Sequence, residues 1–198
     1  MMMIKRTGRQ GINLSLGKIA IVFLVTLVMG IGLIPWMCVK AYAATYWNYT
    51  NSLPTAAGTY TLKEDVSISS TWEVNAAITL DLGGKTITMT GTGETVIKIK
   101  SGGNLTLKGN GTITGANVQN KDGGGVYVDG GTFTMQGGTI CNNTAGSGGG
   151  VYVLGGTFTM QGGTISNNTT MWGGGGVDVF SGGTFTSTFT MEGGTICN

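Results

Sequence analysis

Residues 123–143 read GGGVYVDGGTFTMQGGTICNN, and residues 148–168 repeat this stretch with two changes as GGGVYVLGGTFTMQGGTISNN. Equivalent residues of the two copies are 25 positions apart, and a third, longer copy runs from Gly173 to Asn198. A fixed period between 20 and 50 residues is typical of solenoids and other stacked repeats. We therefore give the repeat more weight than any secondary-structure assignment made from short local patterns.

Each copy contains three short runs in which apolar and polar residues alternate, and Gly-Gly pairs separate the runs. Alternation with a period of two places successive side chains on opposite faces of a strand. The Gly-Gly pairs allow the chain to turn sharply between strands. In the first copy, one face holds Val126, Val128, Phe133, Met135 and Ile140, and the other holds Tyr127, Thr132, Thr134 and Thr139.

Strands this short cannot bury an apolar face alone, but they can do so if the chain coils and each turn stacks on the one before. Neighbouring coils then lie about 4.8 Å apart and pair as parallel strands. The sequence therefore predicts an all-β fold, a parallel β-helix solenoid with three short strands per coil of about 25 residues. From about residue 60 onward we expect about six coils, at one coil per repeat.

The chain divides into three parts. We interpret residues 1–43 as a signal peptide, 44–72 as an N-terminal cap or linker, and 73–198 as the β-helix. A cap is expected because a solenoid exposes an apolar end. Residues 116–122 are predicted to form a protruding polar loop before the near-identical repeats, which occupy 123–147, 148–172 and a truncated 173–198. Because the sequence stops within a repeat, we expect a fragment, a truncated gene or further coils downstream.

The third copy carries extra residues between its first two strands. Val151 and Met160 are nine positions apart, whereas the equivalent Val177 and Met191 are fourteen apart. Insertions in repeat proteins map to loops on one face. We therefore expect an outward bulge here, with either Phe185 or Phe189 continuing the ladder of phenylalanines.

The N-terminal segment has the pattern of a secretory signal. A basic region precedes an apolar run at residues 19–34, and Ala41-Tyr42-Ala43 supplies the small residues that signal peptidase accepts. We expect an N-terminal signal helix and a secreted or cell-surface location. An uncleaved anchor is the alternative, because residues 19–39 nearly suffice to span a bilayer.

The net charge of +2 comes from the N-terminal segment. After residue 44 the chain has six lysines, nine carboxylates and no arginine, a net charge of −3. Nucleic-acid binding requires a basic surface. We therefore exclude nucleic acid as a partner and expect membrane contact only through the signal segment.

Catalytic and metal-binding patterns are weak. The chain has no histidine, and its carboxylates are scattered over different points of the coil, where two could still meet across coils, notably Asp81 and Glu94. Residues 173–180 fit the calcium-binding β-roll nonapeptide only once, whereas such rolls repeat it. Cys141 and Cys197 are expected two coils apart, about 9–10 Å, which is too far for a disulfide. We therefore predict no enzyme activity, no catalytic residues, no cofactor and no metal.

Two sets of residues are candidates for a defined role. The asparagines after the third strand are expected to stack as a structural ladder, because asparagine hydrogen-bonds along a stack and tolerates left-handed turns. These are Asn142, Asn143, Asn167 and Asn168. The outward residues are candidates for surface contact, although threonine also suits an exposed strand for its β propensity alone. They are Tyr127, Tyr152, Thr132, Thr134, Thr157 and Thr159.

The stretch GGGV at 148–151, together with ISNN at 165–168, resembles the paired GGA(I/L/V) and FxxN repeats of chlamydial polymorphic outer-membrane proteins. It is also similar to repeats of bacterial surface β-helix (pectin-lyase-like) proteins. The likeness covers residues 123–198 and, more loosely, 60–115, with Gly150 in place of Ala and Ile165 in place of Phe. The resemblance implies a right-handed parallel β-helix in a secreted or surface-displayed, adhesin-like protein.

Two functional hypotheses follow. The first is a non-enzymatic surface β-helix repeat protein, an adhesin-like or structural interaction scaffold whose partners are surface glycans or proteins of a host or neighbouring cell. The second is a carbohydrate-active module, polysaccharide-binding or pectin-lyase-like, whose catalytic coils lie outside this sequence. Two carboxylates facing one another across a cleft would favour the second hypothesis.

Overall fold

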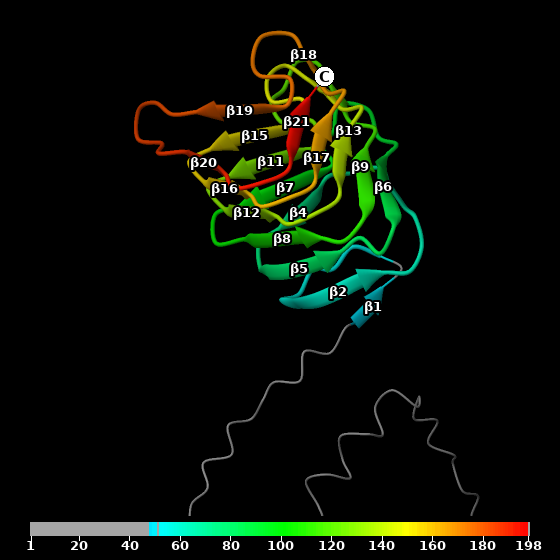
Figure 1. Ribbon diagram of the computed structural model, residues 1–198. Helices are drawn as coiled ribbons and strands as arrows, with labels where there is room; N and C mark the ends of the chain where they lie inside the picture. The colour runs from blue at the N-terminus through cyan, green and yellow to red at the C-terminus, as the bar shows by residue number, and fades with distance from the viewer. Residues whose placement is uncertain (1–47, 51, 198) are drawn as a thin grey trace, which may run out of the picture. The chain divides into compact units, whose positions relative to one another are not determined.

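The computed structural model describes residues 48–50 and 52–197 (Figure 1). The strands of this part pair in parallel and stack as a β-solenoid, as the repeat predicted. The predicted signal peptide and its helix lie outside the described residues. Within the described ranges, the structure contains no helix long and apolar enough to cross a membrane.

Three long sheets and one short sheet make up the solenoid. Sheet 1 has seven strands: β1 (Asn48–Thr50), β2 (Gly58–Leu62), β5 (Ala77–Asp81), β8 (Asn104–Lys108), β12 (Thr132–Met135), β16 (Thr157–Met160) and β20 (Thr188–Met191). Sheet 2 has six: β3 (Val66–Ile68), β6 (Lys85–Met89), β9 (Gly111–Thr114), β13 (Thr139–Cys141), β17 (Thr164–Ser166) and β21 (Thr195–Cys197). Sheet 3 has five: β4 (Trp72–Val74), β7 (Ile97–Lys100), β11 (Val126–Asp129), β15 (Val151–Leu154) and β19 (Val177–Phe180). Sheet 4 has three short strands: β10 (Asn117–Val118), β14 (Thr144–Ala145) and β18 (Thr169–Thr170).

Each full coil passes through sheet 1, sheet 2 and sheet 3 in turn, and Figure 1 shows the coils succeeding one another from cyan β2 to red β21. In the later coils, sheet 4 lies in the connection between sheets 2 and 3. Because the long sheets contain seven, six and five strands, they define no single number of coils. The total of about six therefore stays a prediction.

The 25-residue period is the register of the stacked strands. Phe133 pairs with Phe158, and Phe158 pairs with Phe189. The ring centroids of each pair lie 4.9 Å apart, close to the spacing of neighbouring strands. Phe189 thus continues the phenylalanine ladder, whereas Phe185 lies in the inserted segment 181–187 and packs over Gly155.

The core is the interior of the coils. The inward residues of the first repeat, from Val126 to Ile140, are fully buried, and the alternation of exposed and buried positions follows the predicted faces. These ladders bring identical apolar side chains together in successive coils. Burial of such side chains stabilises a fold by about 1.5–3 kcal/mol each.

Parallel pairing begins before the boundary expected at residue 73. Within the range predicted as cap or linker, β2 pairs with β5 and β3 pairs with β6. Trp72 begins β4, is buried, and donates its indole N–H to the carbonyl oxygen of Pro54 at 2.9 Å. The segment around Pro54 therefore lies against the first coil, while residues from Gly58 onward already belong to the sheets.

The predicted polar loop at 116–122 is only partly a loop. Asn117 and Val118 form β10, which pairs with β14 in the next coil. Ala116 and Val118 are buried. The prediction was wrong for the first half of this segment, because these two small apolar side chains supply enough burial to draw the backbone into the stack.

Candidate functional site

Sheet 3 presents the most varied outer face of the solenoid. Its register places Glu73, Lys98, Tyr127, Tyr152 and Asp178 in one row across five adjacent strands. The flanking residues of these strands, such as Val74 and Ile99, point into the core. Successive residues of a strand face opposite sides, so the row points outward.

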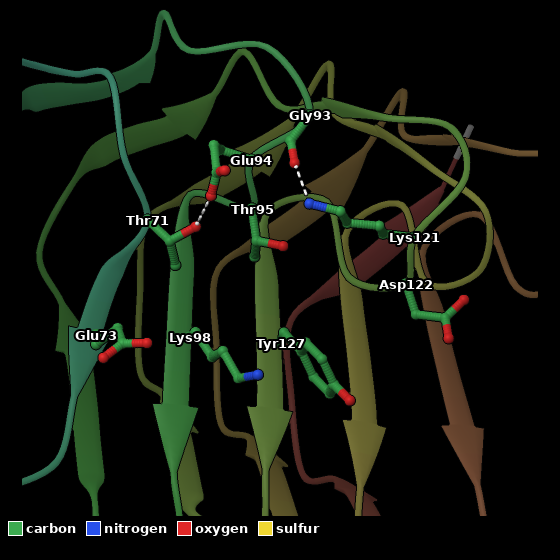
Figure 2. Close-up of a pocket in the computed structure, with 9 residues that line it drawn as sticks. All are labelled: Thr71, Glu73, Gly93, Glu94, Thr95, Lys98, Lys121, Asp122 and Tyr127. Carbon is green, nitrogen blue, oxygen red and sulfur yellow. Dashed lines mark hydrogen bonds between the residues drawn. The ribbon is translucent and has the colours of Figure 1, made fainter.

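A groove of about 440 Å³ lies over one end of this row (Figure 2). Its floor is formed by side chains of β4, β7 and β11, and its wall by the turns that precede β7 and β11. The charged and aromatic residues that line it are Glu73, Glu94, Lys98, Lys121, Asp122 and Tyr127. We call this hollow the sheet 3 groove.

Hydrogen bonds hold the wall of the groove to its neighbours. Thr71 Oγ1 donates to Glu94 Oε2 at 2.8 Å, and Lys121 Nζ donates to the carbonyl oxygen of Gly93 at 2.9 Å, as Figure 2 shows. Thr95 is buried and donates its hydroxyl to Gly123 O at 2.6 Å. Each bond joins residues of different coils, so the wall is tied across the stack.

Ion pairs hold the floor. Lys98 Nζ lies 3.0 Å from Asp129 Oδ2 and 4.7 Å from the centre of the Tyr127 ring. Lys100 Nζ lies 2.8 Å from the Glu73 carboxylate. Exposed pairs of this kind contribute only about 0–1 kcal/mol to stability. Their effect here is to orient Glu73 and Lys98 along the row.

The two tyrosines of the row differ in exposure. Tyr127 lines the groove, whereas Tyr152 is only 7 % exposed and lies near the carboxylate of Asp122. Their rings meet edge to face, with centroids 5.4 Å apart. Tyr152 is therefore much less accessible than Tyr127, and its surface-contact role stays a prediction.

Burial also raises the pKa of both tyrosine phenols. Burial, followed by the nearby charge of Asp122, raises the pKa of Tyr152 to about 12. Burial and the carboxylates of Asp129 and Asp122 raise the pKa of Tyr127. Both phenols are therefore neutral hydrogen-bonding groups at physiological pH.

The predicted threonine surface lies on a different sheet. Thr132 pairs with Thr157 and Thr134 with Thr159 on the outer face of sheet 1, where all four are partly exposed. The structure therefore does not bring the threonine and tyrosine candidates into one site. The threonines form ordered ranks, which matches their expected β propensity.

The two asparagines of each pair have different structural roles. Asn143 and Asn168 are 0 % and 2 % exposed, and Asn168 Oδ1 accepts from both the backbone and the side-chain nitrogen of Asn143 at 3.1 Å. Asn142 and Asn167 are exposed, with φ of 55° and 53°. The second asparagine of each pair thus forms the buried ladder, and the first supplies the left-handed turn.

The carboxylates are less scattered than expected. The sheet 3 groove gathers Glu73, Glu94 and Asp122, while Asp81 lies on sheet 1 and accepts a hydrogen bond from Gly83 N at 2.9 Å. The spacings of 21 and 28 residues between the three do not match the 25-residue period. The available signal was that Glu94 and Asp122 precede strands of one sheet, since such residues lie at the same edge.

Among the described residues, no group of three or more histidine, cysteine, aspartate or glutamate side chains is arranged to hold a metal ion. Cys141 and Cys197 have free thiols, and Ser166 lies between them in the ladder. Burial raises the pKa of the Cys141 thiol.

Comparison of the chain with protein-family models, with curated proteins and with solved structures finds no significant match. Function must therefore be inferred from the geometry of the sheet 3 groove and of the outer faces.

Proposed function

We propose that the chain is a secreted or surface-displayed, non-enzymatic β-helix repeat protein that acts as an adhesin-like interaction scaffold. The observation that carries this proposal is the sheet 3 groove. Polar side chains are held there by bonds between coils, on a stack whose successive coils are in register. A surface fixed in this way loses little conformational entropy when a partner binds.

The charges of the groove support binding. Glu73 is paired with Lys100 and Glu94 accepts from Thr71, so both carboxylates are fixed in position for contact with a partner. We propose surface glycans or surface proteins of a host or neighbouring cell as partners, and a right-handed winding of about six coils behind an N-terminal export signal.

This proposal is tested with the full chain in a bacterial host with an intact export pathway. The protein should be recovered outside the cytoplasm. Beads coated with the protein should retain envelope polysaccharides or matrix proteins more strongly than albumin-coated beads do. Recovery only from the cytoplasm, or retention equal to that of albumin, would contradict the proposed function.

One observation favours a second candidate, a carbohydrate-active module. Three carboxylates, Glu73, Glu94 and Asp122, line one groove, and glycoside cleavage uses two carboxyl groups about 5–10 Å apart. The test is release of new chain ends from polysaccharides, measured for the unaltered chain, for Glu94→Gln and for the control Glu192→Gln in the turn that follows β20. No release is expected. Release that Glu94→Gln abolishes and Glu192→Gln retains would replace the first proposal with this one.

A further inference from the structure

An exposed tryptophan lies beside the sheet 3 groove. Trp172 is in the connection between β18 and β19 and is 71 % exposed. Its backbone nitrogen donates to Gly146 O at 3.0 Å, and Gly146 N donates to Lys121 O at 2.7 Å. Lys121, Gly146 and Trp172 therefore occupy three successive levels of the stack, and Lys121 is itself part of the groove wall.

The glycine at the middle level leaves room for the indole. A Cβ atom at Gly146 would lie 2.9 Å from Cζ3 and 3.2 Å from Cε3 of Trp172. The ring therefore lies over the Gly146 backbone, toward Lys121 and the groove. By the spacing of paired strands, the Lys121 and Trp172 levels are about 10 Å apart. The indole is thus a flat apolar surface next to the wall of a polar groove.

The polar surface continues past Lys121. A second hollow of about 350 Å³ shares Gly93 and Lys121 with the sheet 3 groove. These two shared residues are joined by the hydrogen bond from Lys121 Nζ to Gly93 O. Asn117, Gln119 and Asn120 supply exposed amide groups to the second hollow. Donors and acceptors therefore line a continuous path beside the indole.

The charges along this path nearly cancel, because four carboxylates stand against three lysines. Three carboxylates and two lysines line the sheet 3 groove, and the ion-pair partners Lys100 and Asp129 add one charge of each sign. A strongly anionic or cationic polymer requires a surface of one opposite sign. Neutral hydroxyl groups both donate and accept hydrogen bonds, so they can pair with amides, carboxylates and ammonium groups alike.

We propose that the sheet 3 groove and Trp172 together bind a neutral oligosaccharide chain, with a sugar ring stacked on the indole and its neighbours hydrogen-bonded along the groove. This inference rests on the proposed function as an interaction scaffold and names its ligand class. Tryptophan combines a large apolar ring with an N–H donor, which suits a ligand with an apolar face and a polar edge. Aromatic anchors of this type dominate many binding sites.

The test uses the purified full chain and hexasaccharides of glucose (α- and β-linked), xylose, mannose, galactose and N-acetylglucosamine, with hexagalacturonate as the acidic comparison. At least one neutral hexasaccharide should bind saturably and shift tryptophan fluorescence to shorter wavelength, because the ring covers an exposed indole. Hexagalacturonate should bind more weakly. Trp172→Ala should weaken binding at least about tenfold and remove the shift.

Two further variants separate binding from folding. Gly146→Ala should weaken binding although Trp172 is present, because the added Cβ displaces the ring. Met171→Ala is the matched control, since Met171 is 57 % exposed in the same connection, and it should leave binding unchanged. Circular dichroism and urea unfolding of every variant should match those of the unaltered chain.

Three results would overturn the inference: no saturable binding of any neutral hexasaccharide, tighter binding of hexagalacturonate, or unchanged binding in Trp172→Ala. If no neutral sugar binds but the coated beads still retain matrix proteins, the scaffold function stands and the ligand is a protein. If the beads retain nothing either, both proposals fail.

Discussion

At the scale of single residues, the buried asparagine ladder gives one of the sharpest contrasts in the molecule. Asn143 and Asn142 are neighbours in sequence, yet one is buried among backbone groups and the other is an exposed turn residue. Asn143 Oδ1 accepts from Ala116 N at 3.1 Å, and its Nδ2 donates to Cys141 O at 3.0 Å. A buried polar group that loses its partner costs about 1–3 kcal/mol.

Asn143→Ala should therefore lower the free energy of unfolding by about 2–3 kcal/mol, because Ala116 N and its neighbours lose their buried partner. Urea unfolding followed by circular dichroism measures the change. Asn142→Gly is the matched control and should change stability by less than about 0.5 kcal/mol, because glycine accepts the left-handed turn. Equal losses in both variants would show that the ladder adds nothing beyond the turn.

Ionisation of Tyr152 should lower the free energy of unfolding at alkaline pH. Its pKa is about 12 in the folded protein, above the ordinary value of about 10 expected in the unfolded chain. The folded state thus favours the neutral phenol. Its contribution should be complete below about pH 10 and lost as the pH rises through about 12.

Urea unfolding at intervals from pH 9 to 12 tests this prediction. Stability should fall over the upper part of this range in the unaltered chain and fall less steeply in Tyr152→Phe, which has no phenol to ionise. Parallel pH profiles for the two proteins would mean that Tyr152 is not the source of the dependence.

At the scale of elements, the glycine corner before β11, β15 and β19 decides how closely the later coils approach. Gly150 N donates to Gly175 O at 2.9 Å, and a Cβ at Gly150 would lie 2.4 Å from Gly176 O and 2.7 Å from Ile165 Cγ2. An alanine side chain at this position would thus press on both backbone and core.

Gly150→Ala should lower the free energy of unfolding by about 1–3 kcal/mol, the usual cost of overpacking. Thermal and urea unfolding measure the loss. Gly182→Ala provides the comparison, because its Cβ would meet only the far end of the exposed Phe180 ring at 3.3 Å. It should change stability by less than about 0.5 kcal/mol. A tolerated Gly150→Ala would mean that the corner can open without cost.

At the scale of the whole molecule, stability is shared between neighbouring coils. Strands of one coil pair only with those of the coils before and after it, and the second near-identical repeat, 148–172, lies between two others of the same pattern. In such repeat arrays, stability is approximately a sum over units and their interfaces. One whole unit can therefore be removed without changing the type of contact at the junction.

Deletion of residues 148–172 should leave a folded, shorter solenoid in which Phe133 stacks on Phe189. Its denaturant m-value should fall by about a sixth, in proportion to the surface buried. Deletion of residues 148–160, half a coil, should instead abolish cooperative unfolding of the later strands, because it places mismatched strands over one another. Similar unfolding curves for the two deletions would contradict the stacking in register.

The sequence by itself determined the winding and its interior. A 25-residue period allows identical residues to stack, and strict alternation decides which side chains enter the core, so Phe133, Phe158 and Ile140 could be placed without coordinates. Only the tertiary structure decided that Phe189 rather than Phe185 continues the ladder. The inserted stretch contains two equivalent Thr-Phe-Thr patterns, and only pairing with β16 distinguishes them.

The repeat pattern did not predict the arrangement of side chains on the outer surface. Alternation predicts that Tyr152 points outward, but its exposed fraction also depends on Asp122. Asp122 lies one coil earlier, in the connection that precedes β11. The groove likewise gathers Glu73 from β4, and Glu94 and Asp122 from connections of unequal length. Period and alternation describe strands, whereas the path of each connection over the surface follows from packing between coils, and only the folded chain contains that information.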